Sequence, residues 1–155
     1  MMTNLSCDVI KTLAGKTLVT AESCTGGGIG AALTAVPGSS AVYKGGIISY
    51  TNWVKENLLN VDFELLNTYG AVSPEVAKAM AEGARKALCA DIAVSVTGLA
   101  GPGGDEFGNP VGTVYIGYAD GNRTESIACY FTGNREEIRD QAIYAALQIV
   151  LNYNK

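Results

Sequence analysis

The segment at residues 18–30, LVTAESCTGGGIG, most constrains how this chain can fold, because an apolar run breaks there into three consecutive glycines. Its first residues predict the end of a buried strand, and the small residues at 29–36 predict a helix directly after the turn. Backbone N–H groups at a helix start favour an anion, and glycines let a ligand approach the backbone closely. We therefore expect this turn to form the floor of an active site that contains Ser23. The alternative is that Ser23 only caps the helix and that the glycines only permit close packing of helix and strand.

The rest of the chain alternates helical and strand patterns. Helices are predicted over residues 3–14, after Asn52 as a cap, over 62–68, from the cap Ser73 to about 90, and after Asn134. Strands are predicted over 16–21, 41–50, 92–96, 111–119 and 123–131, and the Gly45-Gly46 pair predicts a bulge or a close backbone approach. The 155 residues fit one domain. We therefore expect a single three-layer α/β/α domain over residues 1–155 with a mixed, mostly parallel sheet.

Composition removes several classes of function. The chain has no histidine, which excludes Ser-His-Asp and Cys-His catalytic groups and histidine metal ligands. Its four cysteines lack a Cys-x-x-Cys spacing, so neither a zinc site nor a redox motif is expected. The net charge of −4 argues against a broad nucleic-acid or anionic-membrane surface. Because no apolar run approaches the roughly 18 residues of a membrane span and no signal-peptide pattern opens the chain, we expect a cytoplasmic protein.

Three predicted parallel strands end in polar segments, at Glu22-Ser23, Ser49-Tyr50 and Thr97-Gly98. Ligands of open α/β sheets bind beyond such strand ends, so we expect these segments to meet at one site. Lys55 or Tyr50 beside a serine can take its proton; alternatively, Tyr50 packs in the core and Lys55 is solvated.

Further candidates follow in the sequence. The glycines around Thr97 can form an N–H nest for a phosphate or an oxyanion, or else belong to a flexible surface loop. Arg135 and Arg139 at the start of the last helix can hold an anion, or else are solvated. Cys24 lies where a helix N-terminus would lower the pKa of a thiol. Asp105 and Glu106 are adjacent acids in a loop, which is weak evidence for a metal site.

The order of the motifs resembles the CinA C-terminal domain family, whose enzymes are nicotinamide-nucleotide amidohydrolases. The segments that carry the resemblance are AESCTGG at 21–27, SYTNWVK at 49–55, VS at 72–73, VTGLAGPGG at 96–104, PVGTV at 110–114 and FTGNR at 131–135. The chain differs from the family's usual pattern at Asn60, Asn109 and Asn134, and Asn109 replaces a common lysine.

The resemblance implies an α/β/α fold and hydrolysis of the carboxamide of nicotinamide mononucleotide (NMN) in the pyridine nucleotide cycle, with no metal or cofactor. Carried over to this chain, Ser23 is the nucleophile and Tyr50 and Lys55 are its activating partners. The substrate-binding residues it implies are Glu22, Thr25, Gly26, Gly27, Thr97, Gly98, Gly101, Gly103 and Arg135. It also implies a homo-oligomer with a small nucleotide as substrate. The alternatives are a catalytically inactive nucleotide-binding module and an amidase for a related small amide.

Overall fold

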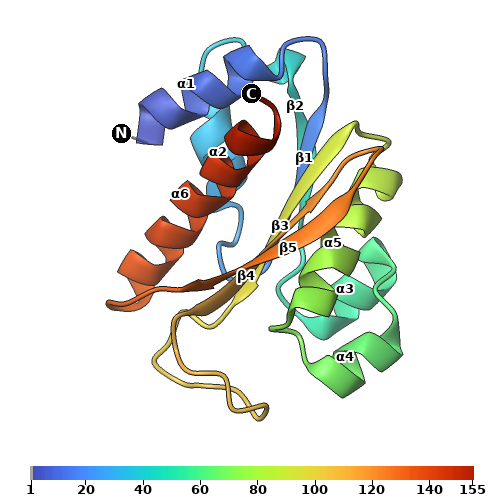
Figure 1. The fold of residues 1–155 in the computed structure, drawn as a ribbon, viewed down its shortest axis with the longest axis vertical. Coiled ribbons are helices and arrows are strands. Elements are labelled where there is room, and N and C mark those ends of the chain that lie inside the picture. The colour runs from blue at the N-terminus through green and yellow to red at the C-terminus, as the bar shows by residue number, and fades with distance from the viewer. Residues whose placement is uncertain (1) are drawn as a thin grey trace.

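The computed structural model describes residues 2–155, which form one five-stranded mixed sheet with helices on both faces (Figure 1). The helices are α1 (Met2–Thr12), α2 (Gly28–Thr34), a short 3-10 helix (Ser39–Ala41), α3 (Asn52–Leu59), α4 (Phe63–Tyr69), α5 (Pro74–Ala87) and α6 (Arg135–Tyr153). The strands are β1 (Leu18–Glu22), β2 (Tyr43–Ile48), β3 (Ile92–Gly98), β4 (Thr113–Ala119) and β5 (Thr124–Tyr130). The α/β fold and the element order predicted from the sequence are confirmed.

The sheet has the order β2-β1-β3-β4-β5. Strand β1 pairs in parallel with β2 and β3, whereas β4 runs antiparallel to both β3 and β5. Four of the five strands therefore point the same way, and the hairpin supplies the one reversed strand. The carboxyl ends of β1, β2 and β3 consequently meet at one edge of the sheet, beyond which the long loop between β3 and β4 projects (Figure 1).

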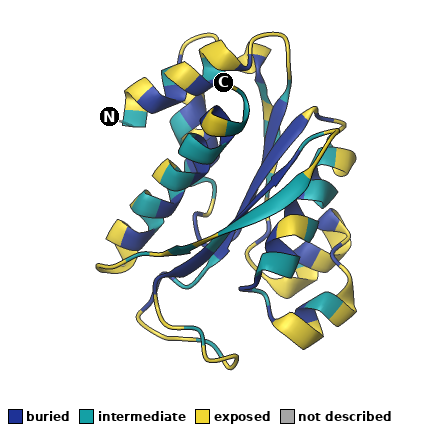
Figure 2. Ribbon diagram, viewed as in Figure 1, coloured by how far each residue is buried: buried dark blue, intermediate teal, exposed yellow. Residues whose placement is uncertain are grey.

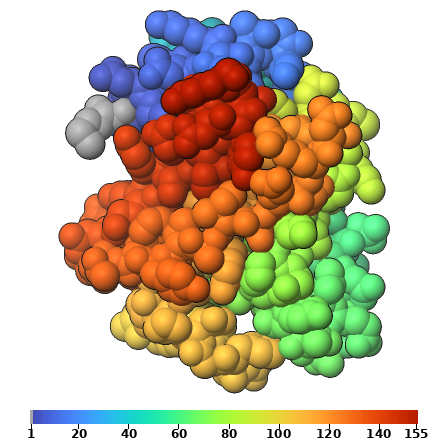
Figure 3. Space-filling view, viewed as in Figure 1, coloured from blue at the N-terminus to red at the C-terminus, as the bar shows by residue number. Residues whose placement is uncertain are grey.

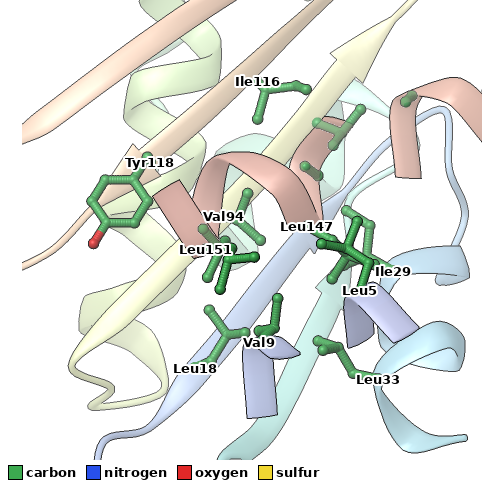
Figure 4. Close-up of a cluster of buried hydrophobic side chains, with 14 of the residues drawn as sticks. Leu5, Val9, Leu18, Ile29, Leu33, Val94, Ile116, Tyr118, Leu147 and Leu151 are labelled. Carbon is green, nitrogen blue, oxygen red and sulfur yellow. The ribbon is translucent and has the colours of Figure 1, made fainter. Parts of the chain in front are cut away.

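Two apolar layers hold the helices on the sheet. Helices α1, α2 and α6 cover one face, where a continuous cluster includes Leu5, Val9, Leu18, Ile29, Leu33, Val94, Ile116 and Leu147 (Figure 4). Helices α3, α4 and α5 cover the other face through a smaller cluster that includes Val19, Leu59, Val76 and Met80. Strands β1 and β3 are buried along most of their length, and the edge strand β5 is only partly covered (Figure 2). No helix among residues 2–155 combines the length and apolar character needed to cross a membrane.

Strand β2 carries the irregularity that its glycine pair predicts. The register with β1 shifts between Leu18 and Val19, so that one residue of β2 is left over as a bulge. A Cβ atom on Gly46 would lie 2.2 Å from Thr20 Oγ1, which is closer than two such atoms can approach. A glycine is therefore needed where the β2 backbone passes the Thr20 side chain of β1.

Most element boundaries differ from the sequence-based expectations by one to three residues, and two of these differences have a visible local cause. Thr51, not Asn52, caps α3, because its side chain accepts a hydrogen bond from Val54 N. Strand β4 begins at Thr113 rather than at residue 111, because Gly112 adopts φ +95° and donates its N–H to the Leu99 carbonyl. Ser73 caps α5 as predicted, with Pro74 in the first turn.

Candidate active site

A cleft of about 290 Å³ lies at the carboxyl ends of β1, β2 and β3. Its lining combines the predicted strand-end segments with the connection between α4 and α5. The lining residues are Ser23, Cys24, Tyr50, Asn52, Lys55, Ala71, Val72, Thr97, Gly98, Leu99, Ala100, Gly101, Gly103 and Arg135. The lining residues that were not predicted as site residues include Asn52, Ala71, Val72, Leu99 and Ala100. All of them except Ala71 lie in segments that carry the family resemblance, which was the available signal.

Ser23 follows β1 directly and is nearly buried, with 8% of its surface exposed. Its N–H donates to the Val96 carbonyl of β3 at 2.9 Å, which continues the sheet by one residue and holds Ser23 at the rim. Lys55 reaches the same point from the second turn of α3 and is 1% exposed. Its Nζ lies 3.2 Å from Ser23 Oγ. The structure thus brings together the predicted nucleophile and one of its two predicted partners.

The surroundings of Lys55 favour an uncharged amine. Burial lowers the pKa of Lys55 from its ordinary value of 10.5 to about 8, and the neighbouring Cys24 opposes this shift only in part. Besides Ser23 Oγ, Nζ has two neighbours, the Ser49 carbonyl oxygen at 2.8 Å and the Tyr50 carbonyl oxygen at 3.4 Å. The ammonium form of Lys55 donates to Ser23 Oγ as well as to the carbonyl oxygens. Carbonyl oxygens can only accept, so once the amine is neutral its two hydrogens can serve the two carbonyls and its lone pair is left for Ser23. This geometry suits a proton acceptor for the serine.

Tyr50 contributes to this arrangement through its backbone and not through its phenol. The Tyr50 side chain is 59% exposed, which removes the alternative that it packs in the core. Its hydroxyl accepts a hydrogen bond from Arg135 Nη2 at 3.2 Å. Arg135 also donates from Nη1 to the Gly101 carbonyl at 2.7 Å. The phenol and the guanidinium therefore form one wall of the cleft.

The glycine-rich loop after β3 adjoins this wall through the contact between Arg135 and Gly101, and it also lines the cleft. Thr97 lines the cleft, and its hydroxyl donates to the Ala71 carbonyl at 2.7 Å, which joins this loop to the α4–α5 connection. Gly98, Gly101 and Gly103 line the cleft as expected. A Cβ atom on Gly98 would lie 2.6 Å from Val114, so this position requires glycine for packing as well.

Glu22 and residues 25–27 of the turn are not part of the cleft lining, which takes only Cys24 from the turn after Ser23. The Glu22 carboxylate accepts hydrogen bonds from Thr25 Oγ1, Ile29 N and Gly30 N at 2.8 to 3.0 Å. The first N–H groups of α2, which we expected to face an anionic ligand, are therefore bound to a carboxylate of the chain itself. Gly26 and Gly27 take the left-handed backbone that this turn needs, with φ +58° and +100°.

Cys24 lines the cleft, but its thiol is protonated at neutral pH. Burial raises the pKa of Cys24 to about 11, although its own backbone N–H and the positive charges of Arg139, Lys55 and Arg135 favour the thiolate. The expectation that a helix start would lower this pKa is therefore wrong, because desolvation outweighs it.

Asp105, one of the two adjacent acids of the β3–β4 loop, stabilises the conformation of that loop. Asp105 accepts hydrogen bonds from Phe107 N, Asn109 N and Asn109 Nδ2. Within residues 2–155 there is no group of three or more potential metal ligands. The Asn109 side chain also donates to the Val72 carbonyl at 3.2 Å, which ties this loop to the α4–α5 connection. The surface is hollowed between the two segments (Figure 3), and a neighbouring pocket lined by Asn52, Leu99 and Phe107 opens there.

Comparison with known proteins connects this site to a family. A family model described as the CinA C-terminal domain matches residues 3–154. A CinA-like protein of Parasynechococcus marenigrum is 54% identical over 122 residues, and one of Endomicrobium trichonymphae is 49% identical over 135 residues. These matches cover 79% and 87% of this chain but 29% and 32% of the relatives. The chain thus spans about a third of the length of these curated relatives.

Solved structures agree over nearly the whole chain. The competence/damage inducible protein CihA from Agrobacterium tumefaciens is 40% identical with a TM-score of 0.95, over 99% of this chain and 96% of that one. The competence damage-inducible protein A from Klebsiella pneumoniae is 36% identical, also with a TM-score of 0.95, over 97% and 95% of the two chains.

Proposed function

This chain belongs to the CinA C-terminal domain family, and we propose that it hydrolyses the carboxamide of NMN to nicotinate mononucleotide and ammonia. The observation that carries the proposal is the contact between the buried Lys55 amine and Ser23 in the cleft. A serine and a low-pKa lysine supply a nucleophile and a base without histidine, which this chain lacks.

The proposed reaction proceeds through an acyl-enzyme. Ser23 Oγ bonds to the amide carbon, its proton passes to the neutral Lys55 Nζ, and the carbonyl electron pair moves onto the oxygen. The C–N bond then breaks, and the nitrogen leaves as ammonia with the proton that Lys55 returns. Water attacks the resulting ester, Lys55 accepts its proton and gives it to Ser23 Oγ, and the carboxylic acid is released.

The charges around the cleft support a substrate that carries a phosphate. None of the ion pairs within residues 2–155 involves Lys55, Arg135 or Arg139. The partners of Arg135, a carbonyl and a phenol, are uncharged, so its positive charge is not neutralised by the protein. We assign the substrate phosphate to Arg135 and the neighbouring Tyr50 hydroxyl.

The remaining predicted site residues have supporting roles in this proposal. Gly98, Gly101 and Gly103 give the substrate close access to the wall after β3, and Thr97 braces that wall. Glu22 and Thr25, with Gly26 and Gly27, hold the turn that presents Ser23.

The test is ammonia release from NMN by the purified protein without added metal, beside Ser23→Ala. We expect release by the parent and none by the variant, with the far-UV circular dichroism of both unchanged. Undiminished release by the variant would exclude Ser23 as the nucleophile. No release by the parent, with NMN binding still measurable by calorimetry, would instead favour the nucleotide-binding module or a different amide substrate.

A further inference from the structure

Arg139 contacts the backbone of the nucleophile's turn. It lies in the second turn of α6 and is partly buried. Its Nε donates to the Cys24 carbonyl at 2.9 Å and its Nη2 donates to the Thr25 carbonyl at 3.2 Å. One guanidinium therefore binds the two consecutive carbonyl oxygens that follow Ser23.

These contacts determine how the peptides after Ser23 are oriented. The Ser23 carbonyl accepts from Gly26 N at 3.1 Å, and the Thr25 carbonyl accepts from Gly28 N at 3.0 Å. The Cys24 carbonyl, by contrast, has Arg139 as its one hydrogen-bond donor among the described residues. In a planar trans peptide the N–H points opposite to the C=O. Arg139 thus sets the direction of the Thr25 N–H and, through the Cys24 backbone, restrains the peptide that carries the Cys24 N–H.

Two donors in this turn are left unused. Within residues 2–155 no oxygen accepts a hydrogen bond from the backbone N–H groups of Cys24 and Thr25, although both residues are buried, and the Cys24 N–H has its own sulfur as a neighbour. Buried N–H groups without a partner are rare in folded proteins. Cys24 lines the cleft directly after Ser23, and Thr25 follows it without lining the cleft itself.

We propose that Arg139 is a positioning residue that holds the backbone N–H groups of Cys24 and Thr25 as the donors for the oxyanion formed when Ser23 attacks an amide. This inference rests on the proposed function. Preorganised N–H donors stabilise charge that develops in the transition state. The forked guanidinium suits the task because it spans two carbonyls at a fixed separation, whereas a lysine ammonium reaches them only as a flexible point charge.

The test compares Arg139→Met, Arg139→Lys and Arg123→Met by their kcat and KM for NMN. Arg123 is the matched control, because its Nη2 also donates to a backbone carbonyl, that of Tyr153, at 3.2 Å, and it lies in the β4–β5 turn at the opposite end of the sheet. We expect Arg139→Met to lower kcat on the order of 10²-fold with KM changed less than about threefold. Arg139→Lys should recover part of the loss, and Arg123→Met should leave both constants unchanged.

Urea unfolding of each variant separates positioning from folding. A kcat loss in Arg139→Met with a folded population equal to that of Arg123→Met supports the proposal. An unchanged kcat overturns it, as does a rise in KM at constant kcat, which would make Arg139 a ligand contact.

A substrate-independent measurement keeps this inference separate from the proposed function. If the parent releases no ammonia from NMN, the rate at which phenylmethanesulfonyl fluoride modifies Ser23, followed by intact mass, is measured instead. Slower modification in Arg139→Met than in Arg123→Met supports the positioning role for acyl transfer in general. Equal rates, or no modification of the parent, overturn it.

Discussion

Replacing Lys55 by methionine tests the low-pKa amine on which the proposed chemistry depends. Lys55 titrates at about 8 in the folded protein and at 10.5 as its ordinary value. At pH values between these two pKa values, Lys55 is protonated in the unfolded chain and neutral in the folded protein. The free energy of unfolding therefore rises with pH in this range. The whole pKa difference changes the free energy of unfolding by about 3 kcal/mol, and roughly 2.5 kcal/mol of this change occurs between pH 7 and pH 10. The methionine variant has a side chain of similar length that does not titrate.

The measurement is urea unfolding of both proteins at pH 7, 8, 9 and 10, followed by circular dichroism. We expect the stability of the parent to increase relative to Lys55→Met by about 2.5 kcal/mol across this range. The reason is that only the parent has a buried ammonium, whose destabilising charge is lost as the pH rises. The variant Lys11→Met, which removes an exposed lysine, controls for the loss of a surface charge. Since only the neutral amine accepts the serine proton, kcat of the parent should rise with pH through about 8. A stability difference that stays constant with pH would refute the assignment of Lys55 as a neutral base.

Two further predictions concern the walls of the cleft. Arg135→Met should raise KM for NMN about 10- to 100-fold, because a hydrogen bond to a charged group contributes about 1.5–3 kcal/mol. KM for the nucleoside, which lacks the phosphate, should change much less. An equal effect on both substrates in the ammonia assay would contradict the phosphate assignment. Ser73→Ala should lower the free energy of unfolding, measured in urea, by about 1–2 kcal/mol. The reason is that the Ser73 hydroxyl accepts from Val76 N as the cap of α5 and donates to the Gly70 carbonyl. An unchanged midpoint of urea unfolding would show that water replaces the cap.

Local sequence patterns predicted the parts of the fold that local chemistry determines. The strand–turn–helix unit around Ser23, the cap at Ser73 and the bulged β2 each follow from a few adjacent residues. The cap of α3 was placed one residue too late, because Thr51 and Asn52 are both good cap residues and the local pattern does not separate them.

The site was predicted less completely because its chemistry depends on burial and on distant contacts. The convergence of three strand ends correctly located the cleft, since parallel strands end at one edge of the sheet. The pKa of Cys24, the direction of the Tyr50 phenol and the use of Arg139 as a backbone clamp could not be read from spacing. The last two depend on α6, which follows Tyr50 by more than 80 residues in the chain.

The carboxylate of Glu22 explains why the cleft takes its positive charge from side chains. In many α/β proteins the N–H groups of the helix after β1 bind the ligand's anion, but here Ile29 N and Gly30 N are already bound to Glu22. An anionic group of the substrate must therefore find its partner elsewhere, and Arg135 lies in the cleft without an acidic partner. The same carboxylate and Arg139 both hold the Ser23 turn, Glu22 by accepting from N–H and hydroxyl donors and Arg139 by donating to two carbonyls. The turn is thereby restrained by its own chain, and under the proposed function substrate binding falls to the side chains of α3 and α6 and to the β3–β4 loop.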